Sequence, residues 1–144
     1  MKTKILLVDD DQAVREMLGR VLEEQGYLVL PAGNGQQALE LAAATKVNLV
    51  LLDLNLPVKN GWDTFERLTN EDPLLPIIII TARPNQIFPA LAAGVGALME
   101  KPLDFPKLLQ TIRALLDEPA ETRLARIAGK PADFHYTPGQ DSRK

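Results

Sequence analysis

The chain has 144 residues and is 46% hydrophobic, which is enough to bury one sizeable core, so a single domain is expected. It contains no cysteine, which excludes disulfides, thiolate metal sites and a thiol nucleophile, and no apolar stretch approaches the roughly 20 residues that span a bilayer. The net charge is −3, and because the 5 basic and 3 acidic side chains of residues 119–144 match no nucleic-acid-binding pattern, neither DNA nor RNA binding is expected.

Three units of strand followed by helix are predicted in the first half of the chain. The strands are placed at Lys4–Val8, Tyr27–Leu30 and Val47–Leu52. After the first strand, apolar residues recur at helical spacing until Gly26, which ends the helix. The next two helices are predicted over Gly35–Ala44 and over Gly61–Thr69, where Trp62 is expected to pack in the core.

The second half continues the alternation, with strands predicted at Pro76–Ile80 and Ala97–Met99. Pro84 and Pro89 lie between these strands. Because proline is unfavourable inside a helix, we expect a loop first and then a short helix that starts near Pro89. The last helix is the clearest, with an apolar stripe from Phe105 to Leu116 and with Asp104 placed as its N-terminal cap.

The alternation of apolar runs with amphipathic stretches is typical of an α/β fold, in which a mostly parallel sheet is covered by helices on both faces. Residues 1–118 are predicted to form this domain. Beyond it, residues 119–144 form a C-terminal tail with a weaker pattern. Residues 119–128 are compatible with one short helix, and the remainder of the tail is expected to be disordered.

Polar residues follow four of the predicted strands at the point where each strand ends. They are, in chain order, Asp9 and Asp10, Asp53, Thr81 and Lys101. Because the carboxyl ends of parallel strands meet at one edge of a sheet, and ligands bind there, these side chains are predicted to converge. Taken alone, each of these residues would be interpreted as an ordinary turn, cap or exposed residue, and the neighbouring Asp11 is expected to be a helix cap. The prediction of a site therefore depends on the joint pattern.

The residue types in this pattern favour phosphoryl chemistry. Three carboxylates in one crevice repel one another unless a cation lies between them, and an all-oxygen set of ligands suits Mg²⁺ or a similar hard ion. A lysine ammonium and a threonine hydroxyl supply the positive charge and the hydrogen-bond donor that phosphoryl oxygens require. A carboxylate beside the metal can attack phosphorus to give an acyl phosphate, and Asp53, which stands alone at its strand end, is the candidate nucleophile.

The residues stand in the segments "ILLVDDD", "LVLLDLNLPVKNG", "IIIITA" and "EKPLD", and in this order and spacing the chain resembles the receiver domain of two-component response regulators over roughly Lys2–Glu118. The resemblance implies a flavodoxin-like (βα)5 fold with a five-stranded parallel sheet in the order 2-1-3-4-5. It implies a phosphoprotein that accepts a phosphoryl group from a histidine kinase or a histidine phosphotransfer protein. Such a protein is not otherwise an enzyme, because it promotes only its own phosphorylation and dephosphorylation.

Carried over by position, the resemblance makes Asp53 the phosphoacceptor and implies a Mg²⁺ site, for which Mn²⁺ would be a substitute. Asp10 and Asp53 would ligate the metal directly. The backbone carbonyl of Asn55 would be a third protein ligand, and Asp9 would act through water. Pro57 is expected to shape the loop that follows the phosphoacceptor.

In the same way, Thr81 would hydrogen-bond the phosphoryl group and move with it, and Lys101 would form an ion pair with the phosphoryl oxygens. The bond between Lys101 and Pro102 is expected to be cis, as in the family. Receivers commonly carry Tyr or Phe three residues before this lysine, whereas this chain has Leu98. An aromatic rotamer switch coupled to Thr81 is therefore not expected here.

No helix-turn-helix or catalytic segment is recognisable after Glu118, where the resemblance ends. We therefore expect a stand-alone, cytoplasmic receiver that signals by contact with a downstream protein. A phosphorylation-dependent dimer is left open. Two alternatives are a phosphate-independent interaction module with a receiver-like fold and a phosphatase of the haloacid-dehalogenase type. In the phosphatase, Asp9 rather than Asp53 would be the nucleophile.

Overall fold

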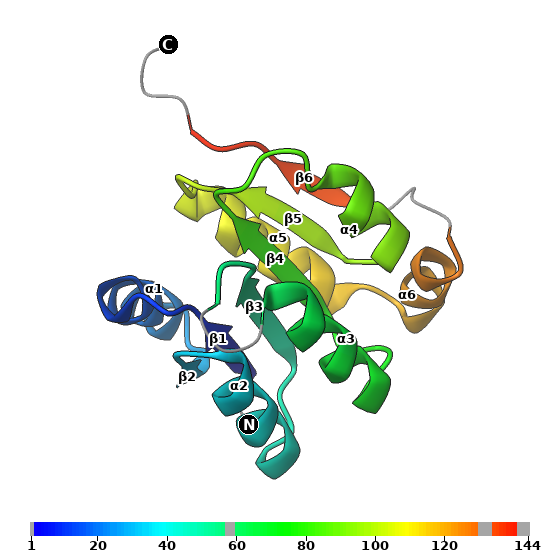
Figure 1. Cartoon of the computed structure of the whole chain (residues 1–144). Coiled ribbons are helices and arrows are strands. Elements are labelled where there is room, and N and C mark those ends of the chain that lie inside the picture. The colour runs from blue at the N-terminus through cyan, green and yellow to red at the C-terminus, as the bar shows by residue number, and fades with distance from the viewer. Residues whose placement is uncertain (1, 57–59, 130–133, 141–144) are drawn as a thin grey trace. The chain divides into compact units, whose positions relative to one another are not determined.

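The computed structural model describes residues 2–56, 60–129 and 134–140. The chain forms two compact units, Met1–Leu75 and Pro76–Lys144, and each combines parallel strands with helices (Figure 1). Pro57, which was expected to shape a loop, lies outside the described residues.

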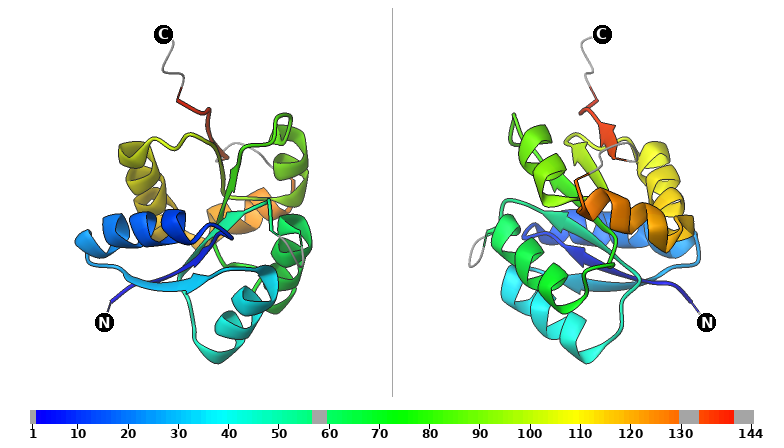
Figure 2. Two further views of the ribbon diagram at one scale, coloured as in Figure 1. Left: turned by 60° about the vertical axis from the view of Figure 1, so that its left-hand side comes forward. Right: turned by 90° about the vertical axis from the view of Figure 1, so that its right-hand side faces the viewer.

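The described part of the first unit is a parallel sheet with the strand order β2-β1-β3, together with three helices. The strands are β1 (Lys4–Val8), β2 (Leu28–Ala32) and β3 (Leu49–Asp53). The helices are α1 (Gln12–Glu24), α2 (Gly35–Ala44) and α3 (Gly61–Glu71). In the views of Figure 2, α1 lies on one face of these strands, and α2 and α3 lie together on the opposite face.

Strands β1 and β3 of this unit are apolar because helices cover both of their faces. Every residue of β3 is buried, and so are all residues of β1 except Lys4. The parallel register pairs Val8 with Leu52. The residues that follow these two positions, Asp9 and Asp53, therefore leave the sheet at the same end.

The described part of the second unit has the strand order β4-β5-β6, also parallel. The strands are β4 (Ile77–Thr81), β5 (Ala97–Glu100) and β6 (His135–Thr137). The helices are α4 (Ile87–Ala93), α5 (Phe105–Asp117) and α6 (Ala120–Ile127). Figure 2 shows α4 and α5 on opposite sides of β4 and β5.

The five predicted strands and the predicted helices are all present, and their ends agree with the prediction within two residues. Asp11 and Asp104 cap α1 and α5 as expected, since their side chains accept hydrogen bonds from backbone N–H groups of the first turn. The fourth helix begins at Ile87, so Pro89 is its third residue, where a backbone N–H has no partner within the helix. No helix among the described residues is long and apolar enough to cross a membrane.

The described part of the tail has more regular structure than the sequence predicted. The short helix is confirmed as α6, and it is anchored by Arg126, whose guanidinium donates two hydrogen bonds of 2.7 Å to the Glu118 carboxylate. The expected disorder of the remainder is wrong for His135–Thr137, which form β6 beside β5. A strand edge with unpaired N–H and C=O groups binds any extended segment that reaches it, and a three-residue strand is too short to give a periodic pattern.

Gly61 allows α3 to start directly against the end of β3. A Cβ atom at this position would lie 2.4 Å from Leu54 Cα and 2.9 Å from the Asp53 carbonyl oxygen, closer than real Cβ contacts. The Gly61 N–H also donates a 2.9 Å hydrogen bond to the Leu54 carbonyl. The backbone of β3 and that of α3 therefore meet at a position that only glycine fits.

We expect Gly61→Ala to lower the free energy of unfolding by about 1–3 kcal/mol, because backbone atoms must move to admit the new methyl group. Gly19→Ala, within α1, is the matched control, since a Cβ there would meet nothing within 4 Å. That change should instead stabilise the protein by up to about 1 kcal/mol through helix propensity. Urea unfolding of both variants measures the difference, and equal effects would contradict the packing argument.

We also expect Tyr136 to lose its proton at a higher pH than an ordinary tyrosine, because its hydroxyl donates a 2.8 Å hydrogen bond to Glu100 Oε1 and this bond raises the pKa of Tyr136 above 10.0. Partial desolvation and the negative charge of Glu100 act in the same direction. The contribution of this hydrogen bond to docking of the tail is complete below pH 10.0. It is lost as the pH rises through the raised pKa of Tyr136. Absorbance titration of Tyr27→Phe isolates Tyr136, and adding Glu100→Gln should lower its pKa.

Candidate functional site

The first acidic pair is fixed by the turn between β1 and α1. Asp9 is 2% exposed, and its Oδ1 accepts a 2.9 Å hydrogen bond from the Asp11 N–H. The Asp9 carbonyl accepts a 2.6 Å hydrogen bond from Arg15 Nη1, which joins this turn to α1. Asp10, which lies between Asp9 and Asp11, is exposed. The turn therefore presents one buried and one exposed carboxylate in succession.

The third carboxylate is the last residue of β3. Asp53 is 3% exposed, and its Oδ1 accepts a 2.9 Å hydrogen bond from the N–H of Asn55. This bond turns the chain immediately after the strand. The close approach of Gly61 to the backbone of Asp53 and Leu54 also restricts this turn.

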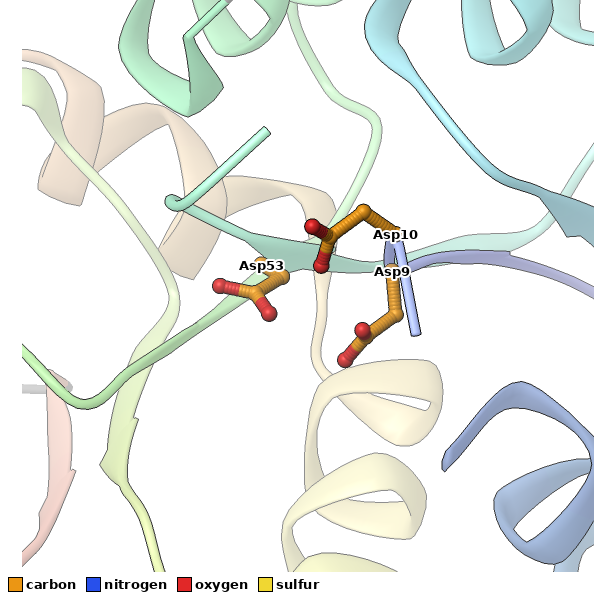
Figure 3. A group of neighbouring side chains, drawn as sticks. All are labelled: Asp9, Asp10 and Asp53. Atoms are coloured by element: carbon orange, nitrogen blue, oxygen red, sulfur yellow. The ribbon is translucent and has the colours of Figure 1, made fainter. Parts of the chain in front are cut away.

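These three carboxylates form one cluster. Ligand oxygens of Asp9, Asp10 and Asp53 all lie within 4.8 Å of one another, and Figure 3 shows the side chains side by side at the ends of β1 and β3. Two unit charges at 4.8 Å repel by roughly 3 kcal/mol at an effective dielectric constant of about 20. The donor set consists of carboxylate oxygens alone, so it fits a hard divalent cation such as Mg²⁺, and a bound cation would offset the repulsion.

The two other predicted site residues lie in the second unit, where adjacent strands end. Thr81 is 1% exposed and pairs with Glu100 in the β4–β5 register, and the Lys101 N–H donates a 2.9 Å hydrogen bond to the Thr81 carbonyl. The Thr81 hydroxyl oxygen accepts a 2.8 Å hydrogen bond from the N–H of Arg83. The expected cis bond between Lys101 and Pro102 is present.

The structure thus brings together two groups of predicted residues, the carboxylate cluster in the first unit and the Thr81–Lys101 pair in the second. The ligand role of the Asn55 carbonyl stays a prediction. Leu98, which stands where receivers commonly carry Tyr or Phe, is a fully buried β5 residue. The Trp62 ring meets the Phe65 ring edge to face with centroids 5.6 Å apart, but Trp62 is only half-buried and does not belong to the buried core in which it was expected.

Sequence reasoning missed residues of the tail that lie against the Lys101 backbone. The N–H of Gln140 donates a 3.0 Å hydrogen bond to the Pro102 carbonyl, and a Cβ on Gly139 would lie 2.5 Å from the Lys101 carbonyl oxygen. The lone signal in the sequence was the glycine itself, because a close backbone approach often requires one.

The carboxylate cluster and the Thr81–Lys101 pair both lie in a segment that matches a known protein family. Residues 5–113 match the family described as response regulator receiver domain. The response regulator MprA of Mycolicibacterium vanbaalenii is 39% identical over 118 residues, which are 81% of this chain and 51% of MprA. The chain therefore spans about half the length of the curated relatives it matches.

Solved structures agree with this match. A CheY-like response regulator receiver domain protein from Methanospirillum hungatei has a TM-score of 0.79 and 31% identity, covering 85% of this chain and 98% of that one. Response regulator protein TrrA from Thermotoga maritima, solved in complex with Mg²⁺-BeF, has a TM-score of 0.73 and 29% identity, covering 80% of this chain and 99% of that one. The predicted flavodoxin-like fold with strand order 2-1-3-4-5 is confirmed, and β6 is an additional short strand.

We expect Asp10→Asn to weaken Mg²⁺ binding at least about ten-fold, because the cluster loses one of its charged ligands. The matched control is Asp11→Asn, which changes the adjacent acid but keeps a good helix cap. Calorimetric titration with Mg²⁺ measures both affinities. Equal losses in the two variants would show that net negative charge, and not the three-carboxylate cluster, attracts the metal.

Proposed function

The chain belongs to the response regulator receiver family, and from this premise we propose that it is a phosphoacceptor signalling module that carries a phosphoryl group on Asp53. The observation that supports this most strongly is the cluster of Asp9, Asp10 and Asp53, whose oxygens lie within 4.8 Å of one another. It combines a candidate nucleophile with the ligands of a divalent metal at the end of two adjacent strands.

In the proposed reaction, a carboxylate oxygen of Asp53 attacks the phosphorus of a phosphohistidine on the donor protein. A new O–P bond forms while the P–N bond breaks, and the donor imidazole leaves with the electron pair of that bond. The Asn55 N–H, which donates to Asp53 Oδ1, orients the carboxylate for this attack. Mg²⁺, or Mn²⁺ in its place, would supply positive charge against the approaching phosphoryl oxygens.

The residues that would hold the metal are Asp10 and Asp53 directly, the Asn55 carbonyl, and Asp9 through water. The burial of Asp9 and its hydrogen bond from the Asp11 N–H fit an indirect role, since one of its oxygens is already fixed by the turn. Asp10 is exposed and can reach a cation without losing a protein hydrogen bond that positions the turn.

We propose that Thr81 and Lys101 serve the transferred phosphoryl group. A threonine hydroxyl can donate a hydrogen bond to one phosphoryl oxygen, and a lysine ammonium can neutralise another. Support comes from the family match, which includes both positions, and from their pairing at the ends of β4 and β5. Because the Lys101 backbone is bonded to the Thr81 carbonyl, a shift of one residue is transmitted to the other.

The proposed donor is a histidine kinase or a histidine phosphotransfer protein, and the proposed output is contact with a downstream protein in the cytoplasm. We propose residues 1–118 as the receiver domain and residues 119–144 as its C-terminal extension. The phosphatase alternative is not retained, since the family match covers residues 5–113. The remaining alternative, which the experiment below distinguishes from this proposal, is a phosphate-independent interaction module.

We expect the chain to take up one phosphoryl group from acetyl phosphate in the presence of Mg²⁺, and Asp53→Asn to abolish the uptake. Asp9→Asn should slow the uptake but leave the label on Asp53, and Asp11→Asn should have little effect because Asp11 caps α1. Intact mass measurement with peptide mapping follows the label. Failure of the unaltered chain to become labelled would favour a phosphate-independent module, and a label on Asp9 would contradict the assigned nucleophile.

A further inference from the structure

The segment His135–Gln140, here called the tail strand, runs beside β5 and the turn that follows it. The His135 N–H donates a 3.1 Å hydrogen bond to the Gly96 carbonyl just before β5 begins. The register then pairs Ala97–Met99 with His135–Thr137. Beyond the strand, the Gln140 N–H donates to the Pro102 carbonyl at 3.0 Å. The tail strand is therefore bonded to the residue before β5 and to the turn that follows β5.

The tail strand lies close against the backbone of Lys101. A Cβ atom on Gly139 would lie 2.5 Å from the Lys101 carbonyl oxygen and 3.0 Å from its carbonyl carbon. These are backbone atoms, so no side-chain movement can make room for a larger residue. The absence of a side chain at Gly139 lets the tail strand lie directly over the peptide between Lys101 and Pro102.

A side-chain contact also fixes the tail strand next to this peptide. The Tyr136 hydroxyl donates a 2.8 Å hydrogen bond to Glu100 Oε1, the residue before Lys101. Three consecutive residues of the chain, Glu100, Lys101 and Pro102, are thus each contacted by the tail strand. The backbone that carries the Lys101 side chain is held between β4, through the Thr81 carbonyl, and the tail strand.

The tail strand also reaches the loop after Thr81. A cavity of about 280 Å³ is lined by Arg83 and Pro84 of this loop, by Lys101, and by Gly139 and Gln140 of the tail strand. The Arg83 N–H is bonded to the Thr81 hydroxyl oxygen. Both chain segments that carry the proposed phosphoryl-binding groups of this unit therefore border the same cavity as the tail strand.

We infer that the tail strand is a positioning element for Lys101, and that its docking is linked to the phosphoryl state of the protein. The inference rests on the proposed function of Asp53 and Lys101. When the tail strand is docked, the Lys101 backbone is fixed and its ammonium can meet phosphoryl oxygens with less loss of conformational freedom. By reciprocity, a phosphoryl group that engages Lys101 makes docking of the tail strand more favourable.

The test uses the full chain with Mg²⁺, with and without acetyl phosphate. In the unaltered protein, acetyl phosphate should slow hydrogen exchange of the 134–140 amides at least about five-fold, the lower end of typical coupling between sites. Gly139→Val should detach the tail strand and reduce the rate of phosphoryl uptake at least about five-fold. Its Mg²⁺ affinity should stay unchanged, because the carboxylate cluster lies in the first unit.

Two further variants separate positioning from general damage. Tyr136→Phe keeps the aromatic ring and removes the hydrogen bond to Glu100, so it should shift exchange and uptake in the same direction by a smaller factor. It also provides the test if Gly139→Val does not fold. Gly19→Ala, where a Cβ meets nothing within 4 Å, is the matched glycine control and should leave both readouts as they are.

The outcomes separate this inference from the proposed function. Phosphoryl uptake by the unaltered chain, combined with an unchanged uptake rate in folded Gly139→Val and Tyr136→Phe, overturns the role of the tail strand and leaves Asp53 in place. A parallel loss of Mg²⁺ affinity and uptake in Gly139→Val also overturns it, because general destabilisation then accounts for the effect. No uptake by the unaltered chain overturns both proposals.

Discussion

Asp9, Asp10 and Asp53 repel one another, and the parallel pairing of β1 with β3 keeps them from moving apart. The register places the ends of both strands at the same level, and the hydrogen bonds from the N–H groups of Asp11 and Asn55 then hold two of the carboxylates in tight turns. Burial of β1 and β3 under helices on both faces makes this arrangement costly to relax. The fold thus creates a concentration of negative charge that a divalent cation can offset.

In the second unit, the constraint acts on the backbone of a flexible lysine, Lys101. A lysine side chain has several rotatable bonds, so its useful position depends on the backbone that carries it. Here that backbone is bonded to the Thr81 carbonyl on the β4 side and covered by Gly139 on the other. β5 is thereby an inner strand within the described part of this unit, paired with β4 and with the tail strand.

In each of the two units, a glycine permits two backbone segments to pack closely. Gly61 lets the start of α3 lie against the end of β3, and Gly139 lets the tail strand lie against the turn after β5. At each position a Cβ atom would fall within 2.5 Å of a backbone atom. Both glycines lie beside proposed site residues, Asp53 and Lys101, so close backbone packing supports each half of the proposed chemistry. Neither glycine carries a functional group itself.

Much of this organisation follows from the order of residues alone. Apolar runs separated by amphipathic stretches identify the strands and helices, since burial on both faces demands them, and polar residues directly after β1, β3, β4 and β5 identify the candidate site. The caps Asp11 and Asp104 are equally local, because a cap needs only the side chain and the first turn of its own helix.

Tertiary structure decided what depends on partners distant in the sequence. β6 forms because the edge of β5 offers backbone groups to a segment more than thirty residues later, and no local pattern in "HYT" reveals that pairing. The bond from Tyr136 to Glu100 and the approach of Gly139 to Lys101 exist for the same reason. The sequence by itself determined which chemical groups are available at the strand ends, and only the pairing of distant backbone segments decided what holds them there.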